Sequence, residues 1–250
     1  MQHPHNDFLA ILRDERRGLL ERLRKTRFST LKAGYSHGQI IPHASYSPWL
    51  DDESFLKLFS RISPTYTLVD IYRCHELYAL AQQLIHVPGD LVEVGVWRGG
   101  TAALIGSAAS TKSIHLFDTF SGVAKASEHD TFYSGGEHSD TSVEVVKSLM
   151  RSLNLECHIH IGVFPDDTYA DLPELISFAH IDVDTYQSAR EACLTIWPRL
   201  SKSGVIVFDD YGFFGCEGVT QAVHELAAAT PNAFFLHNLN GHAVLVKLDS

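Results

Sequence analysis

The sequence lacks several features that would each indicate a class of function. It has no uninterrupted run of the roughly 18 apolar residues that a membrane helix needs, and its start, MQHPHNDFLA, lacks the pattern of a secretory signal. It also has no basic block, and its 30 acidic residues against 20 basic ones give a formal net charge of −10, which repels a phosphate backbone. We therefore expect a cytoplasmic protein that binds neither a membrane nor nucleic acid.

Cysteine is scarce and scattered. The four cysteines, at positions 74, 157, 193 and 216, form no CxxC pair. Neither a zinc knuckle nor a disulfide framework is indicated by such spacing. We expect reduced, buried thiols.

The chain of 250 residues, 45% of them hydrophobic, is long enough for one large core with appendages. Residues 1–88 contain amphipathic patterns such as DESFLKLFSRI and predict a helical N-terminal extension. Within it, residues 28–50 are rich in Ser, Gly, Pro, Tyr and His, which is typical of a lid or a disordered segment.

From residue 89 onward, short apolar strands alternate with amphipathic helices. Seven such runs, from LVEVGV to HAVLVKL, predict an α/β domain over residues 89–250 with a mostly parallel, seven-stranded sheet covered by helices on both faces. The last two runs, separated by Asn-Gly, predict a hairpin-like pair. Ligands of such sheets bind beyond the carboxyl ends of the strands.

The end of the first strand carries a cluster of glycines at 95, 99 and 100, which let the backbone turn sharply toward a ligand at the start of a helix. Trp97 stands where a GxGxxG fingerprint needs glycine. Asp118 ends the second strand about 20 residues later, at the spacing of a ribose-binding carboxylate, although an aspartate there also suits a turn cap. Gly162 and Phe164, at the third strand end, could lie against an adenine ring, and Phe164 could equally be core.

Four aspartates follow the fourth and fifth strands: Asp182, Asp184, Asp209 and Asp210. Carboxylates that meet at one sheet edge repel one another unless some are protonated or a cation lies between them. Oxygen ligands favour Mg²⁺, or Mn²⁺ or Ca²⁺ in its place. Taken alone, each aspartate also fits a helix cap, and Asp184 with Gln187 would form a capping box.

With these motifs placed, the sequence resembles the macrocin O-methyltransferase (TylF) family over roughly residues 64–246. VPGDLVEVGVWRGGTA, LFDTFSGV, GGEHSDTSVEVV, HIDVDTYQSA and RLSKSGVIVFDDYG carry the resemblance in order. It implies a Rossmann-like class I methyltransferase fold, S-adenosylmethionine as methyl donor, Mg²⁺, and a hydroxyl of a sugar or natural-product scaffold as acceptor. It also implies Asp184 as general base and Asp182, Asp209 and Asp210 as metal ligands. The cofactor-binding residues that it implies are Glu93, Gly95, Trp97, Arg98, Gly99, Thr101, Asp118, Thr119, Gly162, Phe164 and Asp182.

Several alternatives stay open. The aspartates would also suit a metal-dependent nucleotide-sugar transferase, and the glycine turn would suit a non-catalytic S-adenosylmethionine-binding protein. Residues 129–142 suggest a mobile lid whose His129 or His138 could act as the base, with Thr141 and Glu144 as the capping box of the next helix. The acceptor could be a glycosylated polyketide, a nucleotide sugar, a phenolic scaffold or a peptide. We expect a homodimer or higher homo-oligomer.

Overall fold

The computed structural model describes residues 13–22, 27–28, 37–38, 46–230 and 232–248. The chain divides into two compact units, Met1–Ser47 and Pro48–Ser250. The first contains a helix at 13–22 and two short antiparallel strands, β1 (Arg27–Phe28) and β2 (His37–Gly38). Most of the lid or disordered segment expected at 28–50 falls outside the described residues.

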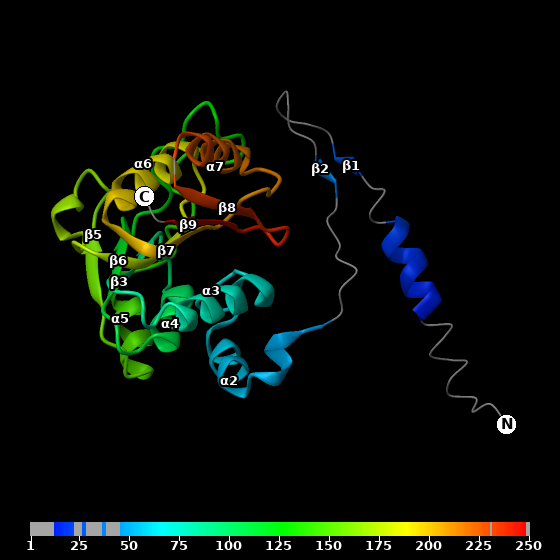
Figure 1. The fold of residues 1–250 in the computed structure, drawn as a ribbon, viewed down its shortest axis with the longest axis horizontal. Helices are drawn as coiled ribbons and strands as arrows, with labels where there is room; N and C mark the ends of the chain where they lie inside the picture. Colours follow the sequence, from blue (N-terminus) through cyan, green and yellow to red (C-terminus); the bar gives the residue numbers. More distant parts are fainter. Residues whose placement is uncertain (1–12, 23–26, 29–36, 39–45, 231, 249–250) are drawn as a thin grey trace. The chain divides into compact units, whose positions relative to one another are not determined.

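The second unit is built on a seven-stranded sheet in the order β5-β4-β3-β6-β7-β9-β8 (Figure 1). All neighbours up to β7 are parallel, and β9 runs antiparallel to both β7 and β8. The mostly parallel sheet and its closing antiparallel pair are therefore confirmed. The strands are β3 (Asp90–Val94), β4 (Ile114–Asp118), β5 (His158–Ile161), β6 (Ile176–Ile181), β7 (Leu200–Phe208), β8 (Ala233–His237) and β9 (Ala243–Lys247).

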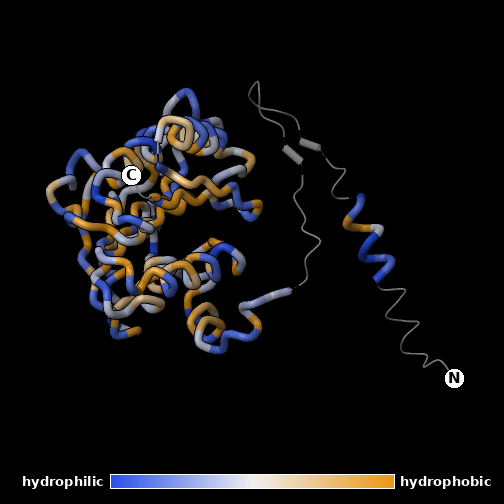
Figure 2. The backbone as a smooth tube through the Cα atoms, viewed as in Figure 1, coloured by the Kyte–Doolittle hydropathy of each residue, from blue (hydrophilic) through white to orange (hydrophobic). Residues whose placement is uncertain are grey.

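Helices cover both faces of the sheet, and each face has its own core. One core includes α3 (Ile71–Gln83), α4 (Gly100–Ala108) and α5 (Val143–Ser152), and the other includes α6 (Tyr186–Ile196) and α7 (Glu217–Ala229). The unit also has α2 (Glu53–Ile62) and three short 3₁₀ helices, η1 (Pro48–Asp51), η2 (Tyr169–Asp171) and η3 (Trp197–Arg199). Along α2 and α3, hydrophobic and hydrophilic residues alternate (Figure 2), as expected for helices with one buried side.

Two of the N-terminal helices that the sequence predicted, α2 and α3, belong to this second unit. Asp52 caps α2 by accepting a hydrogen bond from the Phe55 amide at 2.9 Å, and Phe55 is completely buried in the core shared with α4. The boundary expected at residues 88/89 lies between α3 and β3, within this compact unit. None of the helices in the described ranges is both long and apolar enough to cross a membrane.

The predicted capping box at the start of α5 is wrong. The cap is Ser142, whose side chain accepts a hydrogen bond from the Val145 amide at 3.3 Å. The Thr141 hydroxyl instead donates to the carbonyl of Trp97. Tertiary contact with the glycine turn thus shifts the start of the helix by one residue.

Candidate functional site

A cavity of about 280 Å³ lies at the carboxyl ends of the parallel strands. Strand ends far apart in the sequence meet there, as expected for a doubly wound sheet. Three of the predicted cofactor residues, Glu93, Arg98 and Gly99, are not among its lining residues. The predicted residues that do line it are Gly95, Trp97, Thr101, Asp118, Thr119, Gly162, Phe164, Asp182, Asp184, Asp209 and Asp210.

The turn after β3 needs glycine at position 95. Gly95 has a φ of +85°, and a Cβ built on it would lie 1.7 Å from the backbone oxygen of Asp182. No larger residue fits without moving the neighbouring strand end. The turn therefore packs directly against the segment that carries the first two aspartates.

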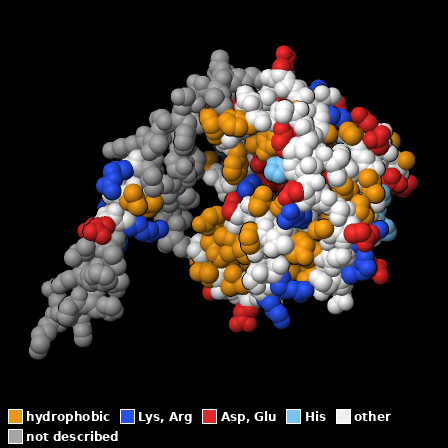
Figure 3. Space-filling view, turned by 180° about the vertical axis from the view of Figure 1, so that it is seen from behind, with side chains coloured by type: hydrophobic (Ala, Val, Ile, Leu, Met, Phe, Trp, Pro, Cys, Tyr) orange, Lys and Arg blue, Asp and Glu red, His pale blue; other side chains and the backbone are white. Residues whose placement is uncertain are grey.

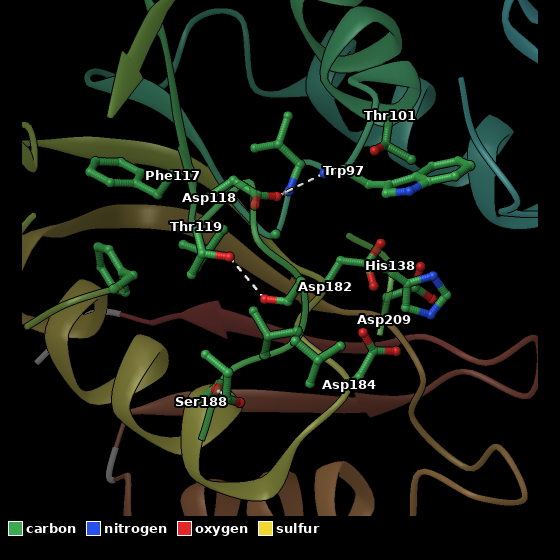
Figure 4. Close-up of a pocket in the computed structure, with 18 of the residues that line it drawn as sticks. Trp97, Thr101, Phe117, Asp118, Thr119, His138, Asp182, Asp184, Ser188 and Asp209 are labelled. Atoms are coloured by element: carbon green, nitrogen blue, oxygen red, sulfur yellow. Dashed lines mark hydrogen bonds between the residues drawn. The ribbon is translucent and has the colours of Figure 1, made fainter. Parts of the chain in front are cut away.

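Asp118 braces this turn. Its Oδ2 accepts hydrogen bonds from the amides of Val96 (2.6 Å) and Trp97 (2.8 Å), and its Oδ1 accepts one from Phe120 (2.6 Å; Figure 4). A carboxylate has about four lone-pair sites, so these bonds leave it able to accept from a ligand hydroxyl. Both interpretations of Asp118, as a turn cap and as a ribose ligand, are compatible with this geometry.

Trp97 and Arg98 tie the glycine turn to the loop after β4. The indole Nε1 donates to Asp140 Oδ1 at 2.9 Å, and Arg98 Nη2 donates to Asp140 Oδ2 at 2.7 Å. The guanidinium also lies over the Trp97 ring, 4.6 Å from its centroid. The side chain of Arg98 thus anchors a loop instead of lining the cavity.

The loop between β4 and α5, expected as a mobile lid, is attached to α6 and α7. Asp130 accepts a hydrogen bond from the Tyr186 amide at 2.8 Å, and Thr131 donates to Glu217 at 3.0 Å. These contacts bring Tyr133 and His138 to the wall of the cavity. His129, the other histidine considered as a base, stacks on Tyr186 with ring centroids 4.1 Å apart and is not among the lining residues.

Aromatic rings form the wall beyond Asp118. Phe164 is buried and packs edge-on against Phe117, with ring centroids 5.0 Å apart. Both rings line the cavity together with Gly162. Phe164 is therefore a core residue with one side on the cavity, and its contact with an adenine ring stays a prediction.

The aspartates after β6 and β7 converge at the other end of the cavity (Figure 4). Asp184 and Asp210 adopt left-handed backbone conformations, with φ of +62° and +60°, where each strand breaks into a turn. The capping box proposed for Asp184 and Gln187 does not form, because Thr185 is the N-cap of α6 and the Gln187 amide donates to Glu191. Asp184 is thus left to face the cavity and His138.

The ionised form is destabilised at three of these carboxylates. Burial, with the charges of Asp209 and Asp210, raises the pKa of Asp182 well above its ordinary value. Burial and Asp209 do the same to the pKa of Asp210. Burial also raises the pKa of Asp184, partly offset by a hydrogen bond from Tyr133.

Asp209 is different because protein groups balance its charge. Burial would raise its pKa, but His242, Arg73 and His180 outweigh burial and lower it. Arg73, on α3, contacts Asp209 directly and also donates from Nε to Asp70 at 2.8 Å. Sequence analysis did not identify this arginine, because it lies in a helix that was assigned to the N-terminal extension.

The donor set fits a hard divalent cation. Asp182 and Asp210 offer oxygen ligands whose ionised forms are destabilised without added positive charge, and Asp209 lies beside them. Arg73 is the one Lys or Arg among the described lining residues, and Asp70 and Asp209 already neutralise it. A cation bound here would relieve the repulsion that the carboxylates create.

Comparisons with known proteins agree with this geometry. A family model described as Macrocin-O-methyltransferase (TylF) matches residues 60–244. The chain is 28% identical over 183 residues to the 8-demethyl-8-(2,3-dimethoxy-alpha-L-rhamnosyl)-tetracenomycin-C 4'-O-methyltransferase of Streptomyces olivaceus, covering 65% of this chain and 68% of the relative. It is 27% identical over 182 residues to the demethyldecarbamoylnovobiocin O-methyltransferase of Streptomyces niveus, with the same coverage of 65% and 68%.

Solved structures share the fold. The O-methyltransferase NovP matches with a TM-score of 0.64 at 24% identity, over 74% of this chain and 83% of that one. The calicheamicin methyltransferase CalS11 matches with a TM-score of 0.60 at 17% identity, over 87% of this chain and all (100%) of that one. The sheet described above is therefore that of class I methyltransferases.

Proposed function

The chain belongs to the macrocin-O-methyltransferase (TylF) family, and we propose that it moves the methyl group of S-adenosylmethionine to a sugar hydroxyl of a natural product, with Mg²⁺ at the aspartate cluster. The observation that carries this proposal is that one cavity joins the glycine turn, Asp118 and the four aspartates. Donor and acceptor must meet in one space for a direct transfer.

We place the methyl donor along the first three strand ends. The close approach of the turn at Gly95, and a start of α4 whose N-cap Gly99 provides no side-chain cap, suit the amino-acid end of the donor. Asp118 suits the ribose, and Phe164 suits the adenine. The sulfonium methyl would then point toward the aspartates, where added positive charge is favourable.

We assign the proton transfer to Asp184. An alcohol is a poor nucleophile near neutral pH, so a base must take its proton as the oxygen attacks the methyl group. The raised pKa of Asp184 brings it closer to neutral pH, where a base works best. When bound, Mg²⁺ supplies Lewis acidity toward the acceptor hydroxyl, and Asp182, Asp209 and Asp210 are the residues that would hold it.

The rim of the acceptor end suits an acceptor with a neutral, apolar body. Leu68 lines the cavity and is 66% exposed. On the face seen in Figure 3, hydrophobic side chains lie on either side of acidic ones. The described lining offers no unpaired Lys or Arg for a diphosphate, which favours a glycosylated scaffold over a nucleotide sugar.

The relatives support the same acceptor class, because their names specify tetracenomycin, novobiocin and mycinamicin derivatives. A nucleotide-sugar transferase would leave the glycine turn without a role. A non-catalytic binder would have no use for the second aspartate pair, so neither alternative is favoured by an observation. The expected homodimer or higher homo-oligomer stays a prediction.

The test is transfer of labelled methyl from S-adenosylmethionine to a panel of rhamnosylated and other glycosylated scaffolds, with Mg²⁺ or with a chelator. Asp184→Asn should lower kcat by about 10²–10⁴-fold while leaving the affinity for S-adenosylhomocysteine unchanged. Asp171→Asn, at an exposed aspartate outside the cavity, is the matched control and should retain activity. Transfer that persists at full rate with chelator contradicts the Mg²⁺ requirement, and donor binding without transfer to any acceptor favours the non-catalytic alternative.

A further inference from the structure

Two histidines flank Asp209 behind the cavity. His180 is the residue before the end of β6, and His242 immediately precedes β9. Both side chains are completely buried, Asp209 is 2% exposed, and neither histidine lines the cavity. The two histidines therefore lie outside the space in which donor and acceptor would meet, whereas Asp209 borders that space.

Each histidine is held from behind by a carboxylate. His180 Nδ1 lies 2.8 Å from Glu93 Oε1, and His242 Nδ1 lies 2.7 Å from Glu76 Oε2. A carboxylate can only accept a hydrogen bond, so Nδ1 of each ring carries a proton. Asn240 donates to the same Glu76 oxygen at 2.7 Å and fixes it further.

The other ring nitrogens have no hydrogen-bond partner within the described part of the chain. His242 Nε2 lies 3.5 Å from Asp209 Oδ1, and His180 Nε2 lies 3.9 Å from Asp209 Oδ2. These separations are too long for strong hydrogen bonds. An unsatisfied buried nitrogen is costly, and two of them aimed at one carboxylate require an explanation.

The arrangement is that of a metal centre. One donor atom from each of the three side chains lies within 4.8 Å of the other two. Histidines that bind metals commonly donate their second N–H to a carboxylate, and carboxylate ligands are themselves hydrogen-bonded. Asp209 Oδ1 meets this description, because it contacts Arg73 and accepts from the Asp210 amide at 2.9 Å.

We propose that His180, His242 and Asp209 bind one divalent cation of the zinc class in a buried structural site. Two imidazole nitrogens and one carboxylate suit Zn²⁺ better than Mg²⁺, which prefers oxygen ligands in octahedral geometry. The charge around the site also favours a cation, since Glu76, Glu93 and Asp209 surround the histidines while Arg73 is the nearest guanidinium. One divalent cation would offset most of that negative charge.

Such an ion would connect parts of the chain that are distant in sequence. Glu76 comes from α3, Glu93 from β3, His180 from β6 and His242 from the start of β9. Asp209 would be fixed directly beside Asp210, which lines the cavity. The proposed ion therefore has a structural role and does not depend on the proposed methyl transfer.

The test is metal content. The full chain is stripped with a chelator, exposed to buffered Zn²⁺ in excess Mg²⁺, passed through a desalting column and analysed by mass spectrometry of the elements. We expect about one Zn²⁺ per chain in the wild type and in Asp182→Asn, which alters only the cavity. His242→Gln should bind Zn²⁺ at least tenfold more weakly, whereas His224→Gln, which removes a histidine bonded to Tyr211 elsewhere, should bind it normally.

A second measurement needs no variant. Long-range ¹⁵N–¹H spectra of the Zn²⁺-loaded wild type should show both Nε2 atoms unprotonated, and Co²⁺ in place of Zn²⁺ should give the visible absorption of a nitrogen-ligated centre. Protons on both Nε2 atoms, or a wild type that takes up no stoichiometric Zn²⁺, would overturn the proposal. Zn²⁺ uptake that is identical in His242→Gln would overturn it as well. Because no result here depends on donor binding or activity, failure of this site is distinguishable from failure of the proposed function.

Discussion

Replacing Arg73 with methionine tests whether the charges beneath the cavity form one coupled unit. Arg73 is 8% exposed, contacts Asp209 directly, donates to Asp70 at 2.8 Å and lies over the Phe213 ring at 4.6 Å. Methionine fills similar space without charge, so the main effect is that the buried Asp209 carboxylate loses its guanidinium partner and keeps only His242 and His180. Removing one partner of a buried ion pair costs about 3–5 kcal/mol.

The assay is urea denaturation of both proteins in the same buffer, with Arg61→Met as the control. Arg61 lies on the exposed surface of α2 and donates to the Ser152 carbonyl at 3.2 Å, so its loss should change the free energy of unfolding by less than about 0.5 kcal/mol. Adding Asp209→Asn to Arg73→Met should recover about 0.5–3 kcal/mol, because the orphaned charge is then gone. The reasoning fails if Arg73→Met is no more destabilising than Arg61→Met, or if the two substitutions at the buried pair are simply additive.

Four further predictions concern the cavity and its surroundings. Gly95→Ala places a Cβ 1.7 Å from the Asp182 oxygen in a left-handed conformation; it should cost at least about 1–2 kcal/mol and abolish S-adenosylhomocysteine binding in calorimetry. Saturating Mg²⁺ should raise the Tm of the wild type, because at 100 times Kd it adds about 2.7 kcal/mol to the free energy of unfolding. It should have no such effect on Asp182→Asn. Asp140→Ala should release the loop held by the glycine turn and increase proteolysis near it, with little change in stability because the carboxylate is exposed; unchanged cleavage would refute that role. Burial raises the pKa of Cys193 to about 12, so iodoacetamide at pH 8 should leave it unmodified in the folded protein while the half-buried Cys157 reacts, as mapped by peptide mass spectrometry.

Much of the fold could be predicted because its strands are buried on both faces and read as short apolar runs. β6 is buried along its whole length, and the segment Ile176–Ile181 is apolar apart from Ser177 and His180. The carboxyl ends of parallel strands lie at one edge of a sheet, so the sequence also predicted that Asp182 and Asp210 lie close together. The strand order itself is known only from the structure.

The buried charge network could not be predicted, because nothing local marks it. Arg73 and Asp209 are 136 residues apart in sequence, and Glu76 meets His242 across 166. Each is ordinary in its own segment, and only the packing of α3 against the sheet reveals the partner. The wrong prediction for the cap of α5 has the same origin. Thr141 satisfies the local rules for a cap, but its hydroxyl donates to the carbonyl of Trp97, which is distant in sequence.

The central claim is that the strand-end cavity binds the methyl donor next to a cation-binding aspartate cluster, and calorimetric titration of S-adenosylhomocysteine into the full chain tests it most directly. The account predicts saturable binding of about one molecule per chain, followed by Mg²⁺ binding that Asp210→Asn eliminates without weakening the binding of S-adenosylhomocysteine. A wild type that binds no S-adenosylhomocysteine at millimolar concentration would contradict the account, whatever the response to Mg²⁺.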